Sequence, residues 1–110
     1  MQRETRDAPV RVPMQRRAGD VVFDVAGCRV PVPLGDALWL RRQIGVHAGS
    51  LRFELSHALA EVRQGRESAP IEVTAADVAA LCTVLLPPPL APLSEPLRQL
   101  RYAVTRRLSR

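Results

Sequence analysis

The sequence predicts an α+β fold in which an N-terminal β-hairpin packs on four short helices, with helix predominating. Two β-branched runs flank a short glycine-containing turn between residues 21 and 34, which is the pattern of a hairpin. After residue 36, apolar residues recur at spacings of three and four, as on one face of a helix. The 110 residues, 46% of them hydrophobic, suffice for one core but not for a doubly wound sheet or an α/β barrel.

The hairpin is expected to join residues 21–25 to residues 28–34. Pro31 and Pro33 stand two apart in the second run. Because the N–H groups of a strand point alternately to its two sides, these prolines remove donors from one edge only. The second run is therefore predicted to be an edge strand, and a possible third strand at 71–73 should pair with 21–25. The apolar face of the second run comprises Cys28, Val30, Val32 and Leu34.

Two helices are expected at 37–47 and 51–65, with Asp36 as the N-cap of the first. A single continuous helix is the alternative. We favour a break near Gly49, because glycine destabilises a helix interior and Ser50 is a good N-cap.

Two further helices are expected in the C-terminal part. Thr74 and Asp77 have the spacing of a capping box, and Pro87 ends the helix that follows. A last helix begins after Ser94 and aligns apolar residues as far as Leu108. The predicted core comprises Val21, Phe23, Val25, Val30, Val32, Leu40, Ile44, Leu51, Leu55, Leu59, Val62, Val78, Leu81, Leu85, Leu97, Leu100 and Val104.

The net charge of +5 is unevenly distributed. Residues 1–19 hold five arginines against two acids, and residues 95–110 hold five arginines against one. The middle has six arginines against eight acids and is slightly acidic. We expect residues 1–19 to form a disordered basic arm and residues 20–110 a single small domain. Sixteen arginines without a lysine are typical of a high-GC bacterial genome.

No catalytic or metal-binding pattern is recognisable. Cys28, Cys82, His47 and His57 lack the close spacing of zinc ligands, and His57 is expected to pair with a neighbouring glutamate. The two cysteines are expected to be reduced and buried, and Asp20 and Asp24 to lie on the solvent side of an antiparallel sheet. Without a nucleophilic motif or a phosphate-binding loop, we expect no enzyme activity and no cofactor.

Trp39, Val46, Phe53 and Ala60 are spaced by sevens on the side of the helices away from the main apolar stripe. This second stripe is covered either by the hairpin and last helix or by a partner. We therefore expect a small protein-interaction, accessory or regulatory module that binds another chain or itself. No apolar stretch is long enough to span a bilayer, and no secretory signal is recognisable, so we expect a cytoplasmic location.

Residues 38–57 resemble a helix-turn-helix, with Ile44-Gly45-Val46 at the turn and Leu51 at an inward position of the second helix. The resemblance implies a DNA-binding regulator as the alternative function. Arg41 and Glu54 depart from the family pattern, which has a small and an apolar residue at these positions. The phosphate contacts in this alternative would come from the basic ends and from Arg41, Arg42, Arg52, Arg106 and Arg107.

Overall fold

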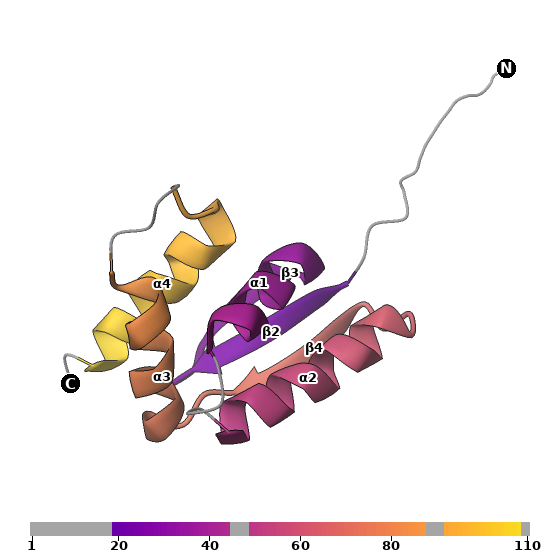
Figure 1. Ribbon diagram of the computed structural model, residues 1–110, viewed down its shortest axis with the longest axis horizontal. Coiled ribbons are helices and arrows are strands. Elements are labelled where there is room, and N and C mark those ends of the chain that lie inside the picture. Colours follow the sequence, from indigo (N-terminus) through magenta and orange to yellow (C-terminus); the bar gives the residue numbers. More distant parts are fainter. Residues whose placement is uncertain (1–18, 45–48, 88–91, 109–110) are drawn as a thin grey trace, which may run out of the picture.

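A β-hairpin, a pair of helices, a third strand and two further helices follow one another along the chain (Figure 1). The computed structural model describes residues 19–44, 49–87 and 92–108. The predicted α+β class is confirmed. The predicted arm, apart from Gly19, lies outside these residues. The elements are β2 (Asp20–Val25), β3 (Cys28–Pro33), α1 (Leu34–Ile44), α2 (Gly49–Arg63), β4 (Ser68–Glu72), α3 (Ala75–Leu85) and α4 (Glu95–Leu108).

The predicted hairpin is confirmed, with Ala26 and Gly27 as its two-residue turn. Both have positive φ angles, 53° and 89°, as a type I′ turn requires. The carboxylate of Asp24 accepts a 2.9 Å hydrogen bond from the Gly27 N–H and braces the turn. The pairing places Val25 opposite Cys28 beside the turn.

The three strands have the order β3-β2-β4, so the third strand pairs with the first, as predicted. It spans Ser68–Glu72, however, and not 71–73. It is also parallel to β2, so the sheet is mixed and the expectation of an antiparallel sheet is wrong in this half. The reason is topological: the connection through α1 and α2 starts from β3, which runs antiparallel to β2, and it brings the chain back in the direction opposite to β3. Strand β4 therefore runs parallel to β2.

Both edges of the sheet carry proline. Pro31 and Pro33 lie opposite Val22 and Asp20 in β2, at the non-hydrogen-bonded positions of the antiparallel ladder. The N–H group of a residue at such a position points away from the partner strand. The prolines therefore remove two donors from the outer edge of β3, as predicted, and another strand cannot pair there without losing hydrogen bonds.

The β4 edge is built in the same way. The N–H of Asp20 donates to the Glu67 carbonyl, and the N–H of Val73 donates to the Asp24 carbonyl. In a parallel ladder, every second residue of a strand directs its N–H and C=O groups to the same neighbouring strand. Because Glu67 and Val73 bond to β2, Pro70 directs its backbone away from β2, to the outer edge. Pro70 thus fits an edge strand, where its missing N–H leaves the pairing with β2 intact.

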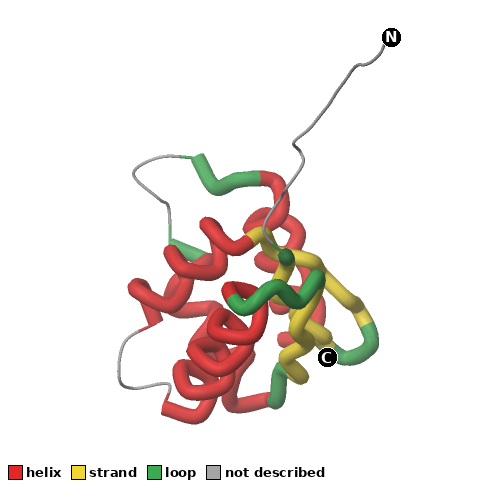
Figure 2. Tube along the Cα trace, turned by 90° about the vertical axis from the view of Figure 1, so that its right-hand side faces the viewer, coloured by secondary structure: helices red, strands yellow, loops and turns green. Residues whose placement is uncertain are grey.

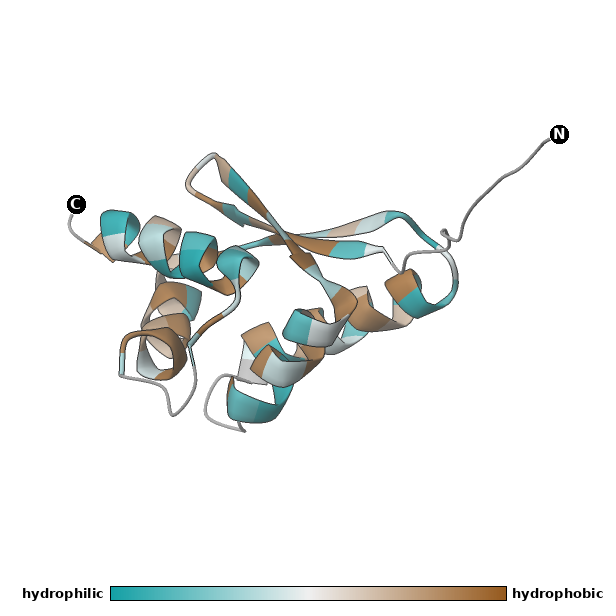
Figure 3. Cartoon of the chain, turned by 90° about the horizontal axis from the view of Figure 1, so that it is seen from above, coloured by the Kyte–Doolittle hydropathy of each residue, from teal (hydrophilic) through white to brown (hydrophobic). Residues whose placement is uncertain are grey.

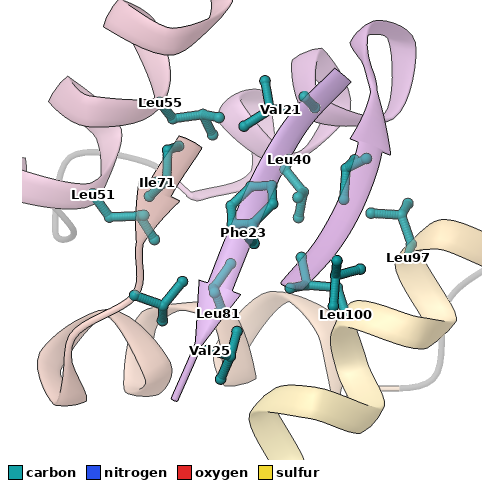
Figure 4. Packing of buried hydrophobic residues seen from close by; sticks show 14 of the residues in the cluster. Val21, Phe23, Val25, Leu40, Leu51, Leu55, Ile71, Leu81, Leu97 and Leu100 are labelled. Atoms are coloured by element: carbon teal, nitrogen blue, oxygen red, sulfur yellow. The ribbon is translucent and has the colours of Figure 1, made fainter. Parts of the chain in front are cut away.

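The helices cover one face of the sheet, which Figures 2 and 3 show from two directions. Phe23 lies at the centre of the core and is fully buried (Figure 4). Every residue of the predicted core is buried. On the other face, Val22 lies in one row with Pro31 and Pro70. The core also includes residues outside the predicted core, namely Ala37, Ala58, Ala69, Ile71, Val73, Leu93 and Ala103.

The first two helices begin earlier than predicted. Helix α1 spans Leu34–Ile44 and so begins before the predicted residue 37, whereas the last predicted residues, 45–47, lie outside the described residues. Helix α2 spans Gly49–Arg63 instead of 51–65. Leu34 therefore starts a helix and does not end the strand. Asp36 is not an N-cap but lies within the first turn of α1, where its carboxylate accepts a 2.9 Å hydrogen bond from the Ser94 hydroxyl. Ser50 likewise lies inside α2, and residues 45–48 lie outside the described residues.

The last two helices begin where expected. The Thr74 hydroxyl accepts from the Asp77 N–H, and the Asp77 carboxylate accepts from the Thr74 N–H, so the capping box is confirmed. Helix α4 buries Leu97, Leu100 and Val104. Leu108 was expected in the same stripe but is 59% exposed, because it lies at the end of the helix beyond the core.

Candidate interaction surface

Two adjoining hollows lie between the hairpin and α4. The first has a volume of about 410 Å³ and is lined by Arg29, Val30, Glu95, Arg98 and Tyr102, among others. The second has a volume of about 210 Å³ and is lined by Ala26, Gly27, Arg106 and Arg107, among others. Cys28 lines both. We call these two hollows together the α4 groove.

The amphipathic pattern of α4 places its side chains in the groove. Leu97, Leu100 and Val104 are spaced by three and four residues and hold one side of the helix in the core. Tyr102 and Arg106 are four residues apart and therefore share another side of the helix. The Arg106 guanidinium lies 5.7 Å from the centroid of the Tyr102 ring, within cation–π range.

The hairpin supplies the facing wall. Val30 is buried on the helix-covered face of the sheet, whereas Cys28, at the end of the same strand, is exposed. The expectation of a buried Cys28 is therefore wrong. Cys28 is the first residue of β3, which forms the edge of the sheet, so this core-facing residue meets the groove and not the core. Val25, opposite Cys28 in the central strand, is buried.

The positive charge of the groove is concentrated at its turn end. At the other end, Arg98 donates to the Leu93 carbonyl at 2.7 Å and to the Glu95 carboxylate. The hydrogen bond from Arg98, helped by one from Gln99, lowers the pKa of Glu95. This pair is neutral overall. Among the described residues that line the hollow at the turn, Arg106 and Arg107 face no carboxylate.

Of the four residues in the predicted second stripe, two are exposed on the same side of one helix. Phe53 is 72% exposed, and Ala60, seven residues later, is exposed on the same side of α2. Trp39 is half-buried on α1 and packs against the core. Val46 lies outside the described residues. His57, between the two exposed residues, pairs with Glu61 at 3.4 Å, as expected.

The predicted nucleic-acid contacts divide between two regions. The Nε of Arg41 donates a 2.7 Å hydrogen bond to the Ser56 hydroxyl and so joins α1 to α2. Arg42 is exposed, and Arg52 is half-buried, with no hydrogen-bond partner for its Nε among the described residues. Arg106 and Arg107 line the α4 groove instead. Helices α2 and α4 lie toward opposite ends of the long axis in Figure 1.

The exposed side of α2 does not resemble a DNA-reading surface. Besides Phe53 and Ala60 it presents Glu54 and His57, and its first exposed arginine is Arg63 at the end of the helix. A recognition helix normally points hydrogen-bond donors at base edges from its first turns.

Sequence reasoning missed the groove as a site. The four-residue spacing of Arg98, Tyr102 and Arg106 is a detectable signal for one helix face. That the hairpin turn lies against this face follows only from the packing of α4 on β3, between residues about 70 positions apart.

Both cysteines are free thiols. Cys82 is half-buried, and burial raises the pKa of its thiol. In the described ranges, no three histidine, cysteine or acidic side chains gather closely enough to hold a metal ion. No helix within these ranges combines the length and apolar character needed to cross a membrane. Comparison with protein-family models, with curated proteins and with solved structures finds no match to this chain.

Proposed function

We propose that this protein is a non-enzymatic interaction module that binds a partner protein through the α4 groove. The observation that carries the proposal is Tyr102, a 64% exposed aromatic residue that lines a hollow beside several arginines. Tyrosine and arginine are concentrated among the residues that dominate the binding energy of protein interfaces. A single exposed aromatic residue on a convex surface would be unremarkable, but here the side chain borders a concave one.

The rigidity of both walls supports the same proposal. Leu100 and Val104 anchor α4 and are fully buried. The opposite wall is a hairpin whose tight turn is braced by Asp24. A surface built on anchored elements loses little conformational freedom on binding, which leaves more of the contact energy for affinity.

The helix-turn-helix alternative has weaker support. The Arg41 guanidinium is engaged in the contact between α1 and α2, and Glu54 lies on the exposed side of α2. An acidic side chain on that surface would repel the phosphate backbone of DNA.

Site-specific photo-crosslinking tests the proposal. A photoreactive phenylalanine analogue is placed at position 102, or at position 53 as the matched control on α2, in full-length protein within its own cells. We expect a discrete protein adduct from position 102, formed again with the purified partner. Arg106→Ala should remove this adduct, whereas Arg63→Ala on α2 should leave it.

Two outcomes contradict the proposal. If position 102 gives no discrete protein adduct, the groove does not bind a protein. If position 53 alone gives one, the interaction belongs to the α2 surface around Phe53 and Ala60, and the groove assignment is wrong.

A further inference from the structure

We infer that the α4 groove binds an extended acidic segment of the partner, with a carboxylate at Arg106 and Arg107 and, two residues away, an apolar side chain against Tyr102. This inference rests on the proposed function and specifies the chemistry of the partner.

The carboxylate site follows from the distribution of charge. Arg106 and Arg107 line the hollow at the hairpin turn, and no carboxylate is among its described lining residues. Among the described residues that line the neighbouring hollow, Glu95 is the only acid, and it is bound by Arg98. An incoming carboxylate therefore meets uncompensated guanidinium groups at the turn end. Guanidinium groups bind carboxylates through paired, charge-assisted hydrogen bonds.

The apolar site adjoins it. In the first hollow the Tyr102 ring, the exposed Cys28 and the buried Val30 come together from α4 and β3. These groups offer an aliphatic side chain a contact with an aromatic face and a weakly polar thiol. Burying such a side chain is favourable, because apolar surface leaves water on both partners.

The spacing of the two sites specifies an extended segment. Tyr102 and Arg106 are four residues apart on a helix, which separates them by about 6 Å along the axis. In an extended chain, side chains on the same side are two residues apart, or about 6.8 Å. An acidic residue and an apolar residue separated by one other residue therefore match the groove.

The segment should bind mainly through its side chains. Pairing along the free edge of β3 would require successive backbone donors, and Pro31 and Pro33 remove those that would follow the N–H of Arg29. This feature distinguishes the groove from a sheet edge that captures any extended strand, and it makes recognition depend on the acidic and apolar side chains.

A nucleic acid fits the same surface less well. A duplex carries one charge per about 1.7 Å of its axis and is held by many phosphate contacts, whereas the hollow at the turn offers two arginines among its described lining residues. A single strand would find only one exposed tyrosine for base stacking among the described residues.

A displayed library of random nine-residue peptides, selected on the full-length protein, tests the inference. We expect enrichment of Asp or Glu at one position and of an aliphatic residue two positions away. For the strongest peptide, Arg106→Glu should weaken binding at least tenfold, and Arg63→Glu on α2 should leave it unchanged. Replacing the acid of the peptide by its amide should have the same effect as Arg106→Glu.

The two native cysteines give a second readout. The bound peptide should slow the alkylation of Cys28 by iodoacetamide at least threefold, because Cys28 lines both hollows. Alkylation of the half-buried Cys82 on α3 should not change. A 20-base-pair duplex at physiological salt should give no such protection.

Selected peptides without an acidic residue, equal loss of affinity in the two arginine variants, or protection of Cys28 by the duplex alone would each overturn the inference. A crosslinked partner at position 102 combined with any of these results would leave the proposed function standing. Absence of that crosslink would instead remove the proposed function itself.

Discussion

Helices α2 and α4 both hold an apolar side in the core and present an aromatic residue to solvent, Phe53 at 72% and Tyr102 at 64% exposure. Their surroundings differ. Phe53 lies on the outer side of α2 with acidic and histidine neighbours, whereas Tyr102 lines a hollow that the hairpin closes on one side. An exposed aromatic residue therefore becomes a candidate binding site only when a second element creates a concave surface beside it.

Both outer helices are also tied to α1 by one side-chain hydrogen bond. Arg41 on α1 donates to Ser56 on α2 at 2.7 Å. Ser94, directly before α4, donates to Asp36 on α1 at 2.9 Å. Each helix therefore has one such bond in addition to its packing in the core, and the two helices can be compared by equivalent substitutions.

The largest effect is expected from the inner sides of the two helices, where they should behave alike. Leu55 on α2 and Leu100 on α4 are both fully buried. Leu55→Ala and Leu100→Ala should each lower the free energy of unfolding by about 2–5 kcal/mol, because each leaves a cavity in the core. Urea denaturation, with the midpoint and slope compared with the parent protein, measures this loss.

The exposed aromatic residues provide the control. Phe53→Ala and Tyr102→Ala should each change the free energy of unfolding by less than about 0.5 kcal/mol. If Tyr102→Ala were as destabilising as Leu100→Ala, Tyr102 would be part of the core packing. Its role as a binding residue would then be lost.

The inner sides of these helices were predictable from sequence, and their outer sides were not. Spacings of three and four residues identify Leu55 and Leu100 as core because periodicity reports which side of a helix faces its own protein. The same reasoning placed Phe53 on the side of its helix away from the main apolar stripe, but it did not decide whether the hairpin and last helix or a partner covers it, and it did not single out Tyr102. Periodicity could not show whether Trp39 is buried or exposed. Its surroundings depend on how α1 is oriented relative to α2, and the spacing of apolar residues within a helix does not specify that orientation.

Local signals of another kind predicted the hairpin, its proline edge and the capping box at Thr74. Each depends on backbone donors within a few residues. The boundaries of β4 were misplaced because Pro70 has two interpretations, a turn or an edge strand, and only its register with Val22 decides between them. The exposure of Cys28 was missed because it depends on where the helices stop covering the sheet.

A smaller effect is expected from the two hydrogen bonds to α1. Ser56→Ala and Ser94→Ala should each lower the free energy of unfolding by about 1 kcal/mol, since each leaves a half-buried charged partner without its hydroxyl. The two losses should add within about 0.5 kcal/mol, because the bonds share no residue. Thermal and urea unfolding of the single and double variants measure both quantities.

Binding should separate the two variants. Ser94→Ala alters the start of α4 and should weaken the binding of an acidic peptide to the groove, whereas Ser56→Ala, which acts on α2, should not. Equal binding by both variants would mean that the position of α4 does not depend on the Ser94–Asp36 bond.

The smallest effect is expected from the ion pair at the end of the groove. The hydrogen bond from Arg98 keeps the pKa of Glu95 below its ordinary value of 4.5, so the folded protein binds this proton less readily than the unfolded chain. The resulting stability is present above pH 4.5 and is lost as the pH falls through the lower folded value. Glu95→Gln should remove this contribution to the pH dependence of stability.

Urea unfolding of the parent protein and of Glu95→Gln between pH 7 and pH 3 measures the difference in unfolding free energy between the two proteins. This difference should narrow below pH 4.5 and shrink at high salt, because both side chains of the pair are exposed to solvent. At neutral pH the same variant should bind an acidic peptide more tightly, since it releases Arg98 and removes the only carboxylate that lines the first hollow among its described residues. Weaker binding would show that Glu95 positions Arg98 for the ligand, and the turn end would then no longer be the sole source of positive charge in the groove.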